Sequence, residues 1–315
     1  MVFLRLVPKT PNIRFIGGKR RMAYFAASLT ALAISLGAFF AVGLNFGIDF
    51  RGGVMIEARS TTGPADISAM RPQLEGLGLG EVTLQTFGAD TDVLIRVQRQ
   101  EGGDDAQQGA VDAIRGALGD GWEWRRTEVV GPTVGAELIQ AGIIAVALSI
   151  AGILLYVWLR FEWQFALAAV AALAHDVLLT IGLFAILQLE FNLSTIAAVL
   201  TIAGYSINDT VVIFDRVREN LRRYKTTALE DVLNRSINET LSRTLNTSVT
   251  TLLALLALYF LGGAVISDFS FAMMFGVIIG TYSTICLATP LLTVLGVRRT
   301  DETPADTAEA AKGST

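Results

Sequence analysis

The carboxyl group of Asp209 lies within an apolar stretch, residues 192–214, that is long enough to cross a bilayer. A charge at the centre of a membrane helix costs roughly 2.5–3.5 kcal/mol on insertion scales, so such residues usually face a bundle interior and mark a path for ions or protons. Packing does not require an acid there, and the adjacent Asn208 already supplies a polar contact. We therefore expect Asp209 to bind and release a proton.

Arg243 begins the polar end of another apolar stretch. Asn246, Thr247 and Thr250 follow it at a spacing of three and four, which places them on one helical face. This face could line a hydrated path that ends at Arg243. An arginine at a cytoplasmic helix end also commonly extends its side chain to the membrane surface without any further role. Position alone does not separate these two interpretations.

Two more ionisable residues, His175 and Asp176, lie inside the apolar stretch 163–187. His175 is the only histidine, so the spacing of a histidine metal site is absent. A histidine titrates near neutrality, and the pair could extend a proton relay. We favour the simpler interpretation, in which both residues bond polar groups inside the bundle. Asp176 is the better relay candidate of the two, because packing does not explain an unpaired acid in a bilayer.

The composition is typical of a membrane protein. Hydrophobic residues make up 52% of the 315 residues, charged residues make up 17%, and the mean hydropathy is +0.52. The single cysteine, Cys286, excludes a disulfide within the chain and is interpreted as a small hydrophobe. The first apolar run is too long for a signal-peptide core and is expected to be a retained anchor. Six runs are predicted to span the membrane: 22–44, 136–159, 163–187, 193–214, 245–261 and 269–295.

The distribution of lysine and arginine predicts the orientation. Seventeen of the 25 basic residues fall before the first span, between the second and third, between the fourth and fifth, or after the sixth. The other eight share the segment between the first two spans with 15 acidic residues. Both termini are therefore predicted to be cytoplasmic. Residues 1–21 form the cytoplasmic N-terminal segment, residues 45–134 a periplasmic domain, and residues 298–315 a disordered cytoplasmic tail.

The periplasmic segment has the pattern of a small α+β domain. Its predicted order, βαββαβ, is that of a ferredoxin-like unit. It contains neither histidine nor cysteine and has no phosphate-binding loop, so we expect a binding or lever domain rather than a catalytic one. The predicted strands are 53–60, 81–88, 92–100 and 122–130, and the predicted helices are 65–77 and 104–118.

A glycine-rich motif joins the first span to this domain. Gly47, Gly52 and Gly53 permit a tight exit from the bilayer, and Asp49 and Arg51 are expected to anchor the turn at the interface. We favour this structural interpretation of the motif over a catalytic one.

Other patterns concern packing. Residues 227–243 are predicted to form an amphipathic helix lying on the inner membrane surface, and Asp215 and Arg216 to form an interfacial pair or cap. Gly276 and Gly280 form a close-packing GxxxG motif in the sixth span. A stripe of small and polar side chains on the fourth span is interpreted mainly as a packing seam: Ser194, Ala197, Thr201, Gly204 and Asn208.

Three motifs in order carry a family resemblance: GIDFRGG (47–53), GYSINDTVVIFDRVREN (204–220) and SRTLNTSVTTLL (242–253). Together they resemble the SecF-type subunits of the SecD–SecF family, which belongs to the resistance–nodulation–division superfamily. The resemblance implies a multi-pass protein of the bacterial inner membrane that assists protein export with proton flow. It implies an intramembrane acid at Asp209 with a basic partner at Arg243. We therefore expect these two residues to face each other across the fourth and fifth spans.

The fold predicted from these observations is a polytopic α-helical membrane protein with six transmembrane helices and a ferredoxin-like periplasmic domain between the first two. Residues 135–297 hold the second to sixth helices. The expected partners are a homologous SecD-like membrane subunit, the Sec translocon channel with its export factors, an unfolded preprotein and membrane lipid, with no nucleic acid. No cofactor, metal ion or enzymatic reaction is expected.

In the favoured mechanism, proton passage near Asp209 and Arg243 moves the periplasmic domain, which holds the emerging polypeptide and assists its translocation and release. One rival is a passive scaffold that conducts no protons, and replacing Asp209 by Asn separates the two. A second rival is half of a small-molecule exporter. It is disfavoured because the outer domain is too small to enclose a large porter cavity.

Overall fold

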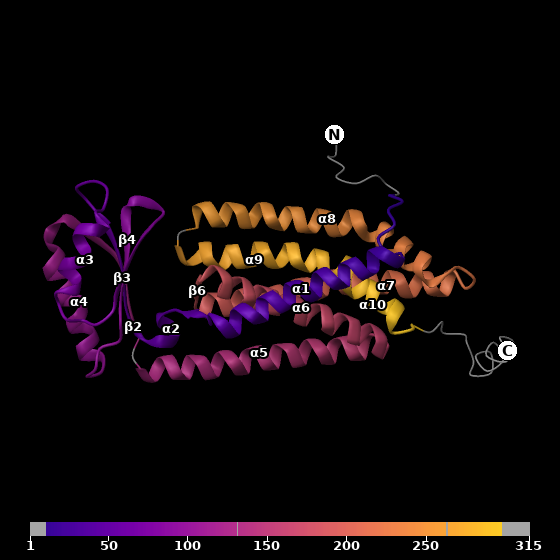
Figure 1. Ribbon diagram of the computed structural model, residues 1–315, viewed down its shortest axis with the longest axis horizontal. Coiled ribbons are helices and arrows are strands. Elements are labelled where there is room, and N and C mark those ends of the chain that lie inside the picture. Colours follow the sequence, from indigo (N-terminus) through magenta and orange to yellow (C-terminus); the bar gives the residue numbers. More distant parts are fainter. Residues whose placement is uncertain (1–10, 131, 263, 298–315) are drawn as a thin grey trace.

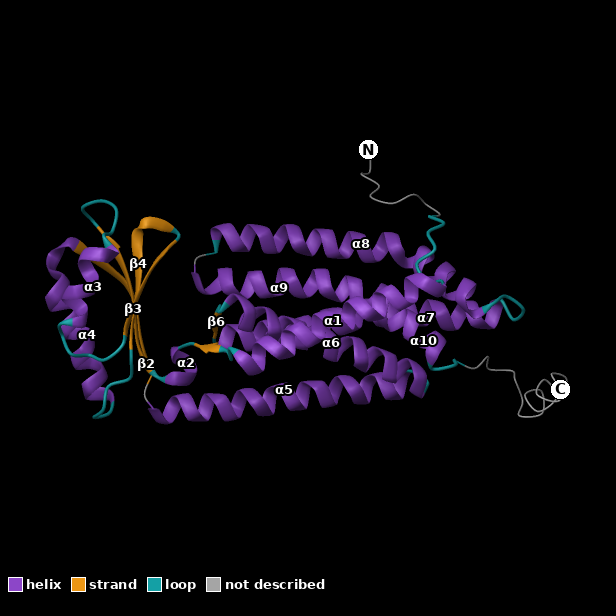
Figure 2. Cartoon of the chain, in the orientation of Figure 1, coloured by secondary structure: helices purple, strands orange, loops and turns teal. Residues whose placement is uncertain are grey.

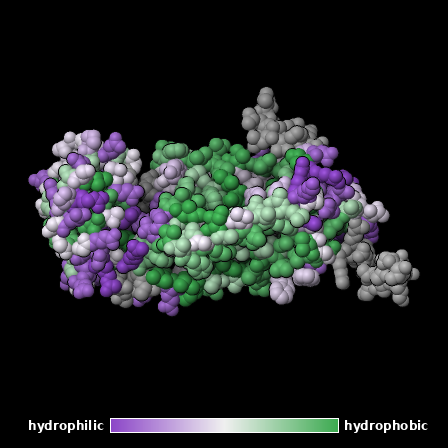
Figure 3. All heavy atoms as spheres, viewed as in Figure 1, coloured by the Kyte–Doolittle hydropathy of each residue, from purple (hydrophilic) through white to green (hydrophobic). Residues whose placement is uncertain are grey.

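The computed structural model describes residues 11–130, 132–262 and 264–297. A bundle of long helices carries a small α+β domain at one end (Figures 1 and 2). Figure 3 shows a hydrophobic band over the helices, with polar surface on the domain at one end and a polar patch at the other. The predicted tail at 298–315 and the first ten residues of the predicted N-terminal segment lie outside the described residues.

Six helices among the described residues are long and apolar enough to span a membrane, which confirms the predicted fold class. The first five are α1 (Gly18–Ala41), α5 (Pro132–Arg160), α6 (Trp163–Leu187), α7 (Leu193–Arg223) and α8 (Leu229–Leu261). The sixth consists of α9 (Ala264–Ser283), a π-helical turn (Thr284–Ala288) and α10 (Thr289–Val294).

The helix predicted near 227–243 is not a separate element on the membrane surface. It is the first part of α8 and continues without a break into the fifth span. Its apolar face is buried against the C-terminal part of α7, through Val232, Leu233, Ile237 and Leu241. The amphipathic pattern was therefore correct, but a neighbouring helix rather than lipid covers the apolar face.

Glycines set the closest helix contacts in the bundle. A Cβ on Gly276 of α9 would lie 2.3 Å from Ile202 of α7, and one on Gly280 would lie 3.2 Å from Ser206. The GxxxG motif thus packs α9 against α7 within this chain. In the same way, Gly182 of α6 allows the close approach of Ser35 in α1.

The π-helical turn contains one residue more per turn than an α-helix, and such turns occur often at functional sites. Thr289 Oγ1 donates a hydrogen bond of 2.8 Å to the carbonyl oxygen of Thr284, five residues earlier. The same carbonyl oxygen also accepts the backbone N–H of Thr289, so both donors of this residue close the irregular turn.

The outer domain has the strand order β3-β4-β2-β5, in which every neighbouring pair is antiparallel. This order and the sequence of elements confirm the ferredoxin-like prediction. The two helices pack on one side of the sheet (Figure 1) and bury alternate strand residues such as Val54, Ile56 and Ala58. The elements are β2 (Gly53–Ser60), α3 (Ile67–Glu75), β3 (Val82–Phe87), β4 (Ala89–Val97), α4 (Asp104–Leu118), a 3₁₀ turn (Gly119–Gly121) and β5 (Trp122–Val130).

A second, two-stranded sheet joins the domain to the bundle. Strand β1 (Asn45–Phe46) follows the first span, and β6 (Glu190–Phe191) lies between α6 and α7. The strands are parallel, with Asn45 opposite Glu190 and Phe46 opposite Phe191. The short helix α2 (Ile48–Arg51) then leads into the outer domain. The start of α7 is therefore held directly beside the exit of the first span.

Candidate functional site

Asp209 lies in the middle of α7, and only 3% of the residue is exposed. Its Oδ2 atom is buried and has no hydrogen-bond partner among the described residues. A buried carboxyl oxygen without a donor is energetically unfavourable. A bound proton, a water molecule or a group from a neighbouring subunit would relieve this cost, which makes Asp209 a site where proton occupancy can matter.

Arg243 lies on α8, the helix that packs antiparallel against α7. Within the described part of the chain no ion pair of 4.0 Å or less joins the two side chains. Arg243 is itself exposed, whereas the hydroxyl of its neighbour Thr244 is buried and lacks a partner. The two predicted partners thus lie on neighbouring helices without a direct ion pair, and their partnership stays a prediction.

Asp176 is fully buried and has the opposite environment. Its Oδ2 accepts hydrogen bonds from Ser206 of α7 at 2.6 Å and from Ser283 of α9 at 2.7 Å. Its Oδ1 lies 2.9 Å from Nδ1 of His175. Because three helices meet on this carboxyl group, Asp176 has a role in packing whether or not it also carries protons. The Nε2 atom of His175 remains buried and without a partner among the described residues.

A polar strip runs along α7 and α8 beside Asp209. It consists of six residues that are exposed on the chain: Thr201, Gly204, Asn208, Arg243, Asn246 and Thr250. A Cβ on Gly204 would meet nothing within 4 Å, so the predicted packing seam is not filled within the described chain. Polar side chains at membrane depth face protein or water rather than lipid. The polar strip is therefore a candidate surface for a neighbouring subunit or a hydrated path, although the hydroxyls of Thr201 and Thr250 also bond to carbonyl groups of their own helices.

The glycine-rich motif forms the turn between the first span and the outer domain. Asp49 Oδ2 accepts a 2.8 Å hydrogen bond from the backbone N–H of Leu193, the first residue of α7. Gly53 has φ 127°, and a Cβ there would lie 2.5 Å from the carbonyl oxygen of Val97. A Cβ on Gly47 would lie 2.7 Å from Glu190 Oε1. The backbone of this motif is thus in close contact with both the outer sheet and the α6–α7 turn.

Arg96 of β4 forms an ion pair with Glu190 at the same junction, and their side chains are 22% and 12% exposed. Burial raises the pKa of Glu190 above its ordinary value, and nearby Asp268 and Asp49 act in the same direction, although Arg96 opposes them. A cavity of about 210 Å³ adjoins the pair between the outer domain and the bundle. Sequence reasoning missed this contact. Glu190 is the only acidic residue in the short turn between the third and fourth spans, and this position could have indicated the contact from the sequence.

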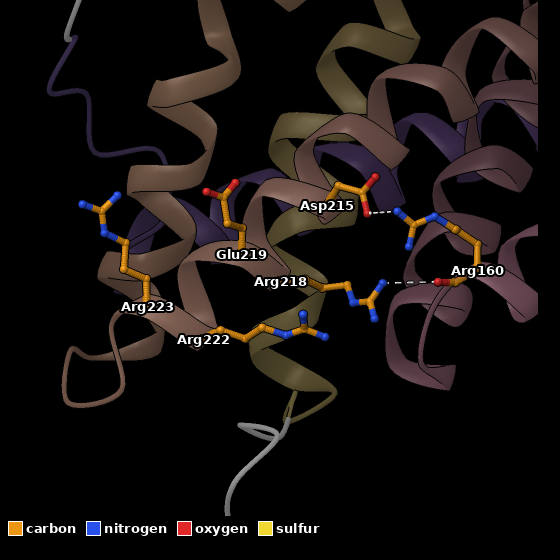
Figure 4. A pocket seen from close by; sticks show the side chains of 6 residues that line it. All are labelled: Arg160, Asp215, Arg218, Glu219, Arg222 and Arg223. Atoms are coloured by element: carbon orange, nitrogen blue, oxygen red, sulfur yellow. Dashed lines mark hydrogen bonds and ion pairs between the residues drawn. The ribbon is translucent and has the colours of Figure 1, made fainter.

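The end of the bundle remote from the α+β domain carries a basic depression of about 570 Å³ between the end of α5 and α7. Figure 4 shows Arg218 and Arg222 extending toward Arg160, while Arg223 points away. Asp215 pairs with Arg160 at 2.6 Å rather than with Arg216, which corrects the predicted Asp215–Arg216 pair. Arg216 instead binds Glu219 and Glu239, each at 2.6 Å. The Arg160–Asp215 pair joins α5 to α7, and the Arg216–Glu239 pair joins α7 to α8.

Among the described residues no group of three or more His, Cys, Asp or Glu side chains is arranged to hold a metal ion. The chemistry that the described side chains offer around Asp209, Asp176 and the junction is proton binding and electrostatic coupling between helices.

Two family models match the sequence. The model for the protein export membrane protein SecD/SecF, C-terminal, matches residues 111–298, and the model for the SecD/SecF GG motif matches residues 37–63. The second match contains the turn that holds Asp49 and Arg51, and the first contains Asp176, Asp209 and Arg243.

Full-length relatives show the same likeness. The protein translocase subunit SecF of Cereibacter sphaeroides is 48% identical over 305 residues, which cover 94% of this chain and 93% of the relative. The protein translocase subunit SecDF of Brucella abortus is 44% identical over 311 residues, which cover 98% of this chain but 41% of the relative. The crystal structure of SecDF from Thermus thermophilus, a translocon-associated membrane protein, matches with a TM-score of 0.79 and 37% identity. That match covers 91% of this chain and 39% of the SecDF chain.

Proposed function

Because this chain belongs to the SecD/SecF family of protein export membrane proteins, among its SecF-type subunits, we propose that it couples proton passage at Asp209 to work on an exported polypeptide. The observation that carries the proposal is the buried Oδ2 atom of Asp209, which lacks a partner among the described residues, and Arg243 lies on the neighbouring helix. Binding and release of a proton change the charge at a buried point of α7. Such a change favours one helix arrangement over another.

The polar strip supports a partner on the face formed by α7 and α8. Asn208 of α7 and Arg243 and Asn246 of α8 are exposed at this face of the chain. Lipid tails offer no hydrogen-bond partners to such polar side chains. A SecD-type membrane subunit covers the strip in our proposal and encloses the proton path at the boundary between the two subunits. The relative in which one chain carries both names, SecDF of Brucella abortus, is consistent with this pairing.

The helix α7 supplies the mechanical link. Sixteen residues separate Leu193 from Asp209, or about 24 Å at 1.5 Å per residue. At its outer end α7 is held by Asp49 and, through the adjoining β6 strand, by the ion pair between Arg96 and Glu190. A shift or rotation of α7 at Asp209 is therefore transmitted to the outer domain by polar contacts rather than by a loose linker.

The remaining partners follow from the family and from the charge pattern. The outer domain lies in the periplasm and holds the emerging, unfolded preprotein, and both termini are cytoplasmic. The subunit works beside the Sec translocon channel and its export factors. The turn formed by Gly47, Asp49, Arg51, Gly52 and Gly53 serves as the structural joint of this device. Asp176 and His175 stabilise the bundle and lie one helix away from the proton path.

The test uses the complex with its SecD-type partner in vesicles, with proton uptake and preprotein export measured together. Asp209→Asn retains the size of the side chain but does not titrate, so both activities should fall to the level of vesicles without the complex. Arg243→Lys keeps the positive charge and should retain part of the activity, whereas Arg243→Gln should not.

The matched control is Asp215→Asn, an identical change on the same helix at the cytoplasmic end, where the carboxylate pairs with Arg160. Proton uptake should persist in this variant. Unchanged export and proton uptake in Asp209→Asn would instead establish the subunit as a passive scaffold.

A further inference from the structure

An apolar groove of about 590 Å³ lies near the outer end of the spans, between α5 on one side and α6 and α7 on the other. Helix α5 runs along the edge of the bundle (Figure 1), and many of its side chains on the flanks of the groove are exposed. The lining is almost wholly aliphatic and aromatic. It includes Phe46, Ile143, Ala147, Ile181 and Ile196.

Arg51 is the one charged side chain that lines this groove. It is exposed and forms no ion pair with any residue that the structure describes. Its position is set by the turn in which Asp49 binds the amide of Leu193, and the rings of Phe46, Phe50 and Phe191 pack together beside it. Arg51 therefore lies at one end of the groove, where α2 leaves the bundle and where its long side chain can reach a charged group at the groove's opening.

We propose that this groove binds a phospholipid of the outer leaflet, with an acyl chain between α5 and α7 and the lipid phosphate on Arg51. The apolar groove matches the acyl chain of a phospholipid, and the single cation at its end matches the phosphate. A guanidinium group binds phosphate through two parallel N–H donors, which favours it over other cations for this contact.

The lining disfavours a polypeptide segment as the occupant. A peptide that is not already helical brings N–H and C=O groups that need partners inside the membrane. Apart from Arg51 the groove offers almost no polar group to receive them. An acyl chain carries no such groups and follows an irregular groove without loss of hydrogen bonds.

Binding here would attach the joint between bundle and outer domain to the lipid headgroups. Arg51 lies two residues from Asp49, which holds α7, and next to Gly52 and Gly53, which begin the outer sheet. The inference does not depend on proton coupling, because neither Asp209 nor Arg243 lines the groove.

The test is photo-crosslinking of the complete complex in lipid nanodiscs, with phosphatidylglycerol that carries a diazirine on one acyl chain. Labelled peptides should come from α5 around Ile143 and Ala147, and from the facing parts of α6 and α7. Arg51→Gln should lower this labelling several-fold, and Ala147→Phe, which fills the groove without touching the joint, should lower it as well.

Three controls separate the explanations. Arg99→Gln removes an exposed charge from the same domain outside the groove, and Ala145→Phe adds the same ring to an exposed position of α5 outside the groove, so both should label normally. A diacylglycerol probe with the same diazirine but no phosphate should label the groove weakly, and Arg51→Gln should not change the amount of this labelling. Excess inorganic phosphate should not compete.

Equal labelling of the groove in the wild type and in both Arg51→Gln and Ala147→Phe would overturn the proposal. So would crosslinks that join the groove to a polypeptide in place of the lipid, or full competition by free phosphate.

Discussion

The Oδ2 atom of Asp49 accepts a hydrogen bond from the backbone N–H of Leu193, so the turn after the first span closes the N-terminus of the helix that carries Asp209. The first amides of a helix have no partner within it, and a carboxylate there also interacts favourably with the helix dipole. Asn192 already caps the third residue of α7 through its own side chain. Asp49 supplies the additional contact from 144 residues away.

Removing this contact should weaken the joint. Asp49→Ala should lower stability by about 1 kcal/mol, the usual effect of losing a helix cap, and should reduce export more than proton uptake. Asp49→Asn keeps an acceptor oxygen and should lose less. The measurements are the thermal unfolding midpoint and the two activities of the reconstituted complex. An Asp49→Ala variant with unchanged export would show that this contact does not transmit motion.

The ion pair between Arg96 and Glu190 gives a second test of the junction. Arg96→Gln leaves Glu190 buried and without its cation, so it should destabilise the protein by about 3 kcal/mol. Glu190→Gln should cost less, because burial already disfavours the ionised form of this side chain. The double variant should recover most of the stability that Arg96→Gln loses. Additive effects in this double-mutant cycle would mean that the two side chains do not interact.

Asp176 should be important for stability. Asn at this position can keep its acceptor oxygen toward Ser206 and Ser283 only by turning its NH₂ group toward Nδ1 of His175, which then has to accept. The imidazole proton would then lie on Nε2, which is buried and has no partner among the described residues. The unfolding midpoint should therefore fall, by an amount equivalent to about 1–3 kcal/mol. Ser206→Ala and Ser283→Ala should each have a smaller effect. Loss of proton uptake in Asp176→Asn with normal thermal stability would instead make Asp176 part of the proton path.

Two glycines of the bundle should respond differently to the same substitution. Gly276→Ala places a Cβ against Ile202, so it should destabilise the isolated chain by about 1–3 kcal/mol, with partial rescue by Ile202→Ala. Gly204→Ala meets nothing within the chain and should leave its stability unchanged or slightly higher. Gly204→Leu should nevertheless weaken association with the SecD-type subunit in a co-purification assay. Normal association would place the partner on another face.

Acid should act on the outer domain through Asp92. Arg59 donates two hydrogen bonds to this buried carboxylate, at 2.5 and 2.7 Å, and holds its pKa below the ordinary value. Because the folded-state pKa is lowered, the ionised form contributes stability above the ordinary pKa of Asp, near 4, and this stability is lost as the pH falls through the folded pKa. Tryptophan fluorescence of a variant that retains only Trp122 and Trp124 would follow domain unfolding. Asp92→Asn should remove this part of the pH dependence.

Much of the fold could be predicted because its signals are local. The period of two in the strand at 53–60 and the period of 3.6 in the helix at 104–118 each specify one face of one element. The six apolar runs are likewise read one at a time. The prediction for residues 227–243 was wrong about the surroundings for the same reason. An amphipathic face shows that something apolar covers it but does not tell lipid from a neighbouring helix.

The candidate site could be predicted only in part. Asp209 stands out because burial of an acid in an apolar run is costly, whichever helix lies next to it. The partners of Asp176 could not be found in this way, since Ser206 and Ser283 are ordinary residues that tertiary packing brings together from two other helices. The pairing of Asp215 with Arg160 joins segments 55 residues apart and also depends on packing. The working partnership of Asp209 and Arg243 stays a prediction.

The widened turn at Thr284–Ala288 leaves the sixth span with one surplus residue, positioned directly after Ser283. If this turn became regular α-helix, the segment before it would rotate by about 100° relative to the segment after it, because an α-helix turns through that angle per residue. Ser283 would then leave Asp176, and Thr284 would leave Thr210. Those two hydroxyl contacts, one to α6 and one to α7, therefore oppose rotation of the sixth span at the irregular turn.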